Sequence, residues 1–116
     1  MSRRTRKNFV MHAGNDRRVI VPVVDQANNP IDLSGAQEIT WIIAKWPGGN
    51  PIVEKTLTGD DIMITNNTTF KFDINPSDTE NKSGHYYHEA QVLNSAGKVY
   101  TPLYGTINIL PTSIEV

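Results

Sequence analysis

The segment Ser83-Gly84-His85-Tyr86-Tyr87-His88 is the most informative part of the chain, and it opens a run that continues to Leu93. Along this run the residues alternate in character, and successive side chains of a β-strand point to opposite faces of its sheet. The alternation therefore predicts a half-buried strand over residues 85–93. The inward residues are Tyr86, His88, Ala90 and Val92, and the outward residues are His85, Tyr87, Glu89 and Gln91.

The rest of the chain is also typical of an all-β protein. No stretch has a sustained 3.6-residue apolar period with caps, and short β-branched and aromatic runs are instead separated by Gly, Pro, Asn and Asp. Because Pro22 has no N–H, its strand should lie at a sheet edge or carry a bulge. Residues 75–83 hold at most one helical turn. We expect strands over residues 9–12, 17–24, 38–45, 52–57, 62–65, 69–74, 85–93 and 98–110.

Short strands with turn signals about every ten residues fit a sandwich of two sheets. In immunoglobulin-like (Ig-like) sandwiches, a Gly-x-Tyr-x-Cys run opens a late strand and a tryptophan is buried between the sheets. Gly84 and Tyr86 match the first two positions of that run, and His88 stands at the cysteine position. Trp41 lies in the middle of an earlier strand. The sequence therefore predicts an Ig-like two-sheet antiparallel β-sandwich of seven to eight strands, with Trp41, Tyr86 and His88 in its core.

The composition of the chain limits its class. Its 116 residues suit one domain, and the absence of cysteine excludes disulfides and thiolate metal sites. The first seven residues carry four cations, but no apolar segment of a signal peptide follows them. No apolar run approaches the roughly 18 residues that span a bilayer. We expect synthesis in a cytoplasm, no membrane partner, a flexible basic arm over residues 1–7 and a single domain over residues 8–116.

No residue pattern indicates catalysis. His85 and His88 are three apart on a strand and point to opposite faces, so they cannot share a metal ion. The pair Asp60-Asp61 is better explained as a solvated turn than as an acid/base dyad. We expect no enzyme activity, no metal site and no cofactor. Trp46 and Tyr87 could form an aromatic platform for a sugar, but we favour a Trp46 that pins its own turn and a Tyr87 in a cross-strand pair.

The two ends of the chain are the candidate docking elements. The basic arm could dock to an acidic protein, contact nucleic acid or merely solubilise the chain. We favour protein docking and do not expect a nucleic-acid partner, since no aromatic residue interleaves the cations. At the other end, apolar side chains have little reason to follow the last strand unless something covers them. The candidate docking residues are Arg3, Arg4, Arg6, Lys7, Ile114 and Val116.

The same chain resembles a family of phage proteins. The segments that carry the resemblance are Val24-Asp25, Pro30-Ile31-Asp32-Leu33-Ser34-Gly35-Ala36, Pro47-Gly48-Gly49, Gly84-His85-Tyr86-Tyr87-His88-Glu89, Ala96-Gly97 and Tyr104-Gly105-Thr106-Ile107. They are similar to segments of the Ig-like domain found at the N-terminus of tailed-phage baseplate upper proteins and in free-standing phage structural proteins. The similarity covers roughly residues 15–110, and its motifs consist of turn and core residues, which specify fold better than function.

The resemblance implies a non-enzymatic virion structural protein of a tailed phage. The family's larger members continue into a coiled coil or fibre, whereas this sequence stops at Val116, which implies an accessory module. Such a module would be a baseplate or tail adaptor, or a decoration of the head surface. Its partners would be other virion proteins, and it would be homo-oligomeric or present in many copies. The alternative from another class is a carbohydrate-binding or adhesin-type β-sandwich.

Overall fold

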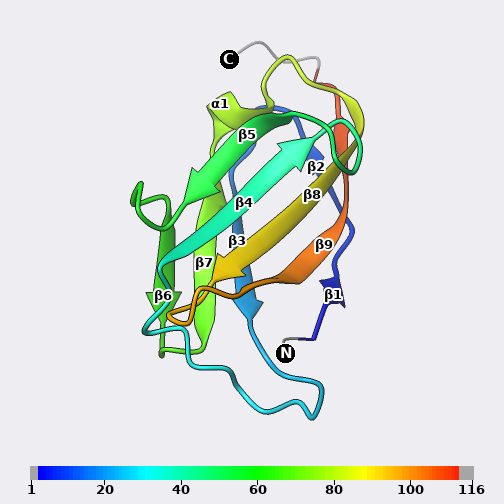
Figure 1. Ribbon diagram of the computed structural model, residues 1–116. Helices are drawn as coiled ribbons and strands as arrows, with labels where there is room; N and C mark the ends of the chain where they lie inside the picture. The colour runs from blue at the N-terminus through cyan, green and yellow to red at the C-terminus, as the bar shows by residue number, and fades with distance from the viewer. Residues whose placement is uncertain (1–2, 113–116) are drawn as a thin grey trace.

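The computed structural model describes residues 3–112, which form two facing β-sheets (Figure 1). The larger sheet has the strand order β1-β9-β8-β4-β5, with β2 also paired to β9, and the smaller sheet has the order β3-β7-β6. The elements are β1 (Thr5–Arg6), β2 (Phe9–His12), β3 (Arg17–Pro22), β4 (Glu38–Ala44), β5 (Pro51–Thr56), β6 (Ile62–Thr65), β7 (Thr69–Ile74), α1 (Pro76–Thr79), β8 (Gly84–Leu93) and β9 (Val99–Leu110).

This strand order is that of an Ig-like sandwich. Strands β3, β7 and β6 make one sheet, while β4, β8 and β9 make the centre of the other, with β5 added beside β4 as in variable-type Ig domains. Neighbouring strands are antiparallel except for β1 and β2, which both run parallel to β9. The predicted fold class is therefore confirmed. Seven strands build the two sheets, and two short N-terminal strands complete one edge.

The expected position of Pro22 is also confirmed. It is the last residue of β3, and β3 is an edge strand of the smaller sheet. The expected strand over residues 17–24 ends there, and Val24 makes only an isolated bridge with Pro30. A proline without an N–H fits the end of an edge strand because no ladder hydrogen bond is lost.

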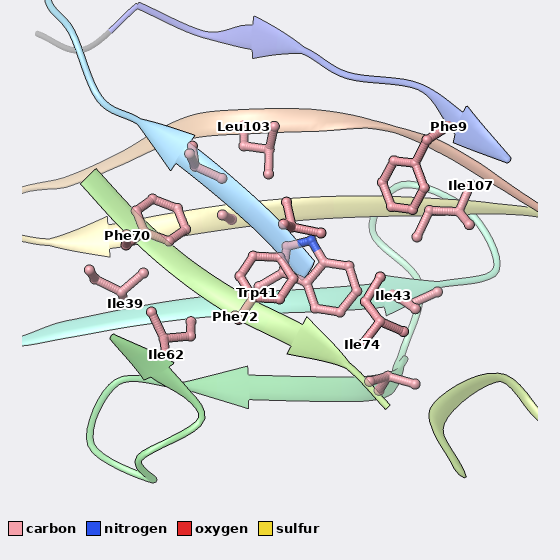
Figure 2. Packing of buried hydrophobic residues seen from close by; sticks show 14 of the residues in the cluster. Phe9, Ile39, Trp41, Ile43, Ile62, Phe70, Phe72, Ile74, Leu103 and Ile107 are labelled. Carbon is pink, nitrogen blue, oxygen red and sulfur yellow. The ribbon is translucent and has the colours of Figure 1, made fainter. Parts of the chain in front are cut away.

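The core lies between the two sheets around Trp41 (Figure 2). The Trp41 side chain is 0% exposed and packs on Phe72 of the opposite sheet, with ring centroids 4.5 Å apart. As predicted, Tyr86 and His88 are buried on the inner face of β8. The other buried apolar side chains around Trp41 include Val19, Val21, Ile39, Ile43, Phe70, Val92 and Ile107.

The N-terminal segment differs from the flexible arm that the sequence predicts. Residues Thr5 and Arg6 form β1, which pairs with Leu103 and Tyr104 of β9. The Arg3 N–H donates to the Val24 carbonyl oxygen at 2.7 Å, and the Lys7 N–H donates to that of Tyr104 at 2.8 Å. The domain therefore includes residues 3–7, and the boundary expected before residue 8 is wrong. Composition misled the prediction, since backbone pairing does not require apolar side chains.

Candidate docking surfaces

The N-terminal segment crosses β9 at a notch made by Gly105. A Cβ atom at position 105 would collide with the Lys7 carbonyl and approach the Asn8 side chain, so only glycine leaves room for this crossing. The Asn8 Oδ1 atom accepts a hydrogen bond from the Thr106 N–H at 2.9 Å. Strands β1 and β2 can therefore pair with the same strand on either side of the crossing.

A buried histidine ties this segment to the core. The Trp41 indole N–H donates to His88 Nδ1 at 3.1 Å, and His88 Nε2 lies 2.7 Å from the Lys7 carbonyl oxygen. Because Nδ1 accepts a hydrogen bond, the imidazole proton is on Nε2, which donates to Lys7. The Phe9 ring packs edge-on against the imidazole, with centroids 5.3 Å apart. His88 thus joins the central tryptophan to the backbone of the N-terminal segment.

The environment of His88 favours its neutral form. Its side chain is 0% exposed, and burial lowers the pKa of His88 from its ordinary value. The hydrogen bond with the Lys7 carbonyl acts in the opposite direction on this pKa, and the Lys7 charge adds to the lowering. Protonation would also place two N–H groups, those of Trp41 and His88, against each other. The sequence reasoning expected a buried His88 but did not find its link to Lys7.

The predicted docking cations lie along the β1 edge of the larger sheet. Arg3, Arg4 and Arg6 are exposed, and Lys7 is half-buried. The Arg4 guanidinium lies 4.5 Å from the centroid of the Tyr104 ring, and the Arg3 guanidinium donates to the side-chain oxygen of Asn28. Arg6 is therefore presented by a paired strand, and Arg3, Arg4 and Lys7 lie directly beside that strand instead of in a loose tail. The other two predicted docking residues, Ile114 and Val116, lie outside the described residues.

The opposite edge of the same sheet is formed by β5 and carries acidic groups. Glu54, Asp60 and Asp61 are exposed on β5 and in the turn that follows it. Lys55 points inward instead, and its Nζ lies 2.7 Å from Asp78 Oδ2 of α1, with little of either side chain exposed. This ion pair connects β5 to the smaller sheet's side of the sandwich. The exposed charged residues of β5 and of the turn that follows it are therefore all acidic.

The proposed sugar platform is only partly formed. Trp46 is 62% exposed, yet its indole also packs over Gly49, where a Cβ would lie 3.0 Å from the ring nitrogen. The pKa of Tyr87 is raised by burial and by the neighbouring Glu89 carboxylate. A hollow of about 200 Å³ lies beside this turn, smaller than the roughly 300 Å³ at which small-molecule pockets begin. Trp46 thus covers its own turn, as favoured above, and sugar binding stays an alternative.

Within residues 3–112, no group of three or more His, Cys, Asp or Glu side chains is placed to hold a metal ion. His85 and His88 point to opposite faces of β8, as their spacing predicts, with His85 exposed. No helix in this part of the chain is long and apolar enough to cross a membrane.

The sequence matches no family model and no curated protein. Among solved structures, the fold is similar to that of CopC from Methylosinus trichosporium OB3b, with a TM-score of 0.53 and 14% identity over 94% of this chain and 89% of that chain. Extracellular domains 3–5 of Drosophila OTK match with a TM-score of 0.41 and 17% identity over 90% of this chain and 32% of that one. The V domain of amphioxus IgVJ-C2 matches with a TM-score of 0.34 and 14% identity over 87% and 98% of the two chains. At this identity, the likeness to CopC shows a shared fold and nothing about ligands.

Proposed function

We propose that this chain is a non-enzymatic accessory protein of a tailed-phage virion, which docks to an acidic surface of another virion protein. The phage context rests on the resemblance of the turn and core segments described above. The docking role rests on the basic β1 edge, which is the single observation that carries this part of the proposal. The choice between a baseplate or tail position and a head-surface position stays open.

The position of Arg4 and Arg6 in the fold supports the proposed docking role. Arg6 is the second residue of β1, and Arg4, two residues before it, lies with its guanidinium 4.5 Å from the centroid of the Tyr104 ring. Backbone pairing to β9 and the contact between His88 and Lys7 fix the strand that carries them. A partner therefore binds side chains whose backbone is already ordered, which lowers the entropy cost of association. Contacts of this kind strengthen at low salt.

The same edge also offers a backbone ladder. An unpaired edge strand can add a strand from a partner, with main-chain hydrogen bonds supplying affinity and side chains supplying specificity. A short basic strand suits this mode because its charges discourage non-specific edge pairing. Ile114 and Val116 remain part of the proposed interface as apolar contacts.

A competition experiment tests the docking role. Wild-type chain and the variant Arg4→Gln/Arg6→Gln, carrying different tags, are supplied together during particle assembly, and their ratio is measured in purified virions. We expect the variant to be depleted severalfold relative to wild type. Lys98→Gln, at an exposed position in the turn before β9, is the control and should compete equally. Equal incorporation of the β1 variant would reject this edge as the docking site.

Substitution is preferable to deletion in this experiment. Removing residues 2–7 would also remove the Lys7 carbonyl that accepts from His88 and the pairing of β1 with β9. A loss of incorporation could then come from an unstable domain instead of a lost contact. Glutamine keeps the backbone and most of the side-chain length while removing the charge.

The carbohydrate-binding alternative has its own test. Exposed Trp46 is the observation that favours it, since an aromatic face that is open to solvent can stack on a sugar ring. A glycan array probed with wild-type protein and with Trp46→Ala would show binding that depends on this ring. Wild-type binding lost in the variant would support a sugar-binding module over the docking role.

A further inference from the structure

Strands β1 and β5 form the two opposite edges of the larger sheet (Figure 1), and the exposed charged residues at these edges differ in sign. The exposed Arg6 lies on β1 and the exposed Arg4 just before it, while Glu54 lies on β5 with Asp60 and Asp61 just beyond it. Strand β9, next to β1, contains no charged residue. The basic edge and the acidic edge are therefore separated by the width of the sheet and do not neutralise each other.

The pairing register connects the two edges by one straight row. Arg6 is paired with Tyr104, Tyr104 with Glu89, Glu89 with Ile42, and Ile42 with Glu54. All five residues lie on the outer face of the sheet, because their neighbours Leu103, Ala90 and Trp41 face the core. Arg6 and Glu54 thus end the same row on the same face.

Backbone groups at both ends of this row point away from the sheet. The Leu57 N–H donates to the Ile39 carbonyl oxygen, so the backbone groups of Leu57 face β4. Because successive residues of a strand turn their backbone groups to alternate sides, the N–H and C=O of Glu54, three residues before Leu57, face the open edge. On the other side, the Lys7 N–H bonds to Tyr104, which turns the N–H and C=O of Arg6 outward. Both residues offer a donor and an acceptor at the edge.

We propose that copies of this chain associate side by side, with β5 of one copy pairing with β1 of the next and Glu54 facing Arg6. Since β1 is parallel to β9 and each following strand is antiparallel to its neighbour, β1 and β5 run in opposite directions. Their contact is therefore antiparallel, and Glu54 and Arg6 exchange two backbone hydrogen bonds with Cα atoms about 5.5 Å apart. Their side chains form a cross-strand ion pair on the outer face.

The neighbouring residues restrict the contact to this short register. The Thr56 N–H and C=O, which alternation also turns toward the open edge, are already bonded to Asp61, so the free backbone of this edge ends at Glu54 on that side. With Glu54 opposite Arg6, Arg4 faces Thr56 and comes beside the Asp61 carboxylate. A shift of register by two residues would lose one of these charge matches. These two charge matches favour a second copy of the chain as an acidic partner of the β1 edge.

Such a contact is heterologous, because it joins two different surfaces of the same chain. Repeated, it gives a ring or an open row of copies, depending on the rotation between neighbours. The inference rests on the proposed docking role of the β1 edge and names an acidic partner for it. It differs from that role in requiring Glu54, which docking to another virion protein through β1 does not.

Sedimentation velocity of the full chain over a range of concentrations tests the inference. At about 10 mM ionic strength, where the Debye length is about 30 Å, we expect reversible association that weakens strongly at about 1 M, where it is about 3 Å. Glu54→Arg and Arg6→Glu should each raise the dissociation constant by about tenfold or more. Lys98→Glu, which reverses an exposed charge away from both edges, should associate like wild type.

Mixing the two variants gives the sharpest result. Glu54→Arg places a cation, and Arg6→Glu an anion, at both ends of the row, so an equimolar mixture should associate more tightly than either variant does alone. Association that the mixture fails to restore, or that Lys98→Glu abolishes equally, would overturn the inference. A wild-type chain that stays monomeric at low ionic strength would also overturn it. That result would leave docking to another virion protein intact, since the competition experiment measures it independently.

Discussion

Replacing His88 by leucine tests the link between the core and the N-terminal segment. The substitution removes the acceptor of the buried Trp41 N–H and the donor to the Lys7 carbonyl oxygen. An unsatisfied buried donor costs about 1–3 kcal/mol, and a lost ordinary hydrogen bond costs about 1 kcal/mol. We therefore expect His88→Leu to lower the free energy of unfolding by about 2–4 kcal/mol at pH 7.5.

The same substitution should remove a pH dependence of stability. The folded pKa of His88 is lowered by burial, so below about pH 6.5 the unfolded chain binds a proton that the folded chain does not. The His88 contribution to stability is therefore complete above about pH 6.5. It falls as the pH drops toward the folded pKa, by up to about 1.4 kcal/mol per pH unit. The leucine variant has no such group and should lose less stability over this window.

Urea denaturation followed by Trp fluorescence between pH 5 and 8, about the range in which histidine titrates, measures both effects. His85→Leu is the matched control, since His85 lies on the same strand and is exposed. It should keep the wild-type pH slope. If His88→Leu retained the wild-type slope, the buried neutral histidine and the hydrogen bonds derived from it would be wrong.

Three further predictions concern the core, the notch and the buried ion pair. Trp41→Ala should lower the free energy of unfolding by about 3–5 kcal/mol, and an unchanged urea midpoint would reject Trp41 as the core residue. Gly105→Ala should displace the Lys7 backbone, so hydrogen exchange at the Lys7 amide should accelerate; unchanged protection would show that the crossing tolerates a side chain. Lys55→Met should cost about 2–4 kcal/mol because it leaves the Asp78 carboxylate without its partner, and a double-mutant cycle with Asp78→Asn should show coupling between the two.

The fold could be predicted from sequence because its signals are local. The alternation after Gly84 placed Tyr86 and His88 inward, and both are buried on β8. Pro22 marked an edge strand for a reason that belongs to its own chemistry. The position of Trp41 between two sheets followed from its place in the middle of a β-branched run. Each of these inferences needed only a few neighbouring residues.

The N-terminal pairing could not be predicted in the same way. Its partner strand is about a hundred residues away in sequence, and nothing in the polar segment before Phe9 shows which strand it joins. The available signal was Gly105, since an isolated glycine in a strand marks a close approach of another backbone. The glycine indicates that another part of the backbone comes close to β9, but it does not indicate which segment does so. Only the three-dimensional structure shows that the segment at Gly105 contains Lys7.

The Lys55–Asp78 pair had a weaker signal of the same kind. Strand alternation puts Lys55 on the inner face together with Val53, which is an unusual place for a lysine. A lysine on the inner face is expected to pair with a buried carboxylate, but the sequence alone does not indicate which of several Asp and Glu residues is the partner. Only the fold brings α1 against β5 and selects Asp78. The candidate docking edges depend on this pairing too, because it removes a cation from the acidic edge.

A reconstruction of tailed-phage virions assembled in the presence of this chain tests the proposed function. We expect density for an Ig-like domain on the particle, with its β1 edge against an acidic protein surface and with Arg4 and Arg6 at the contact. A particle without such density would contradict the proposed function. A domain attached through another face, with β1 open to solvent, would contradict the assignment of the docking edge.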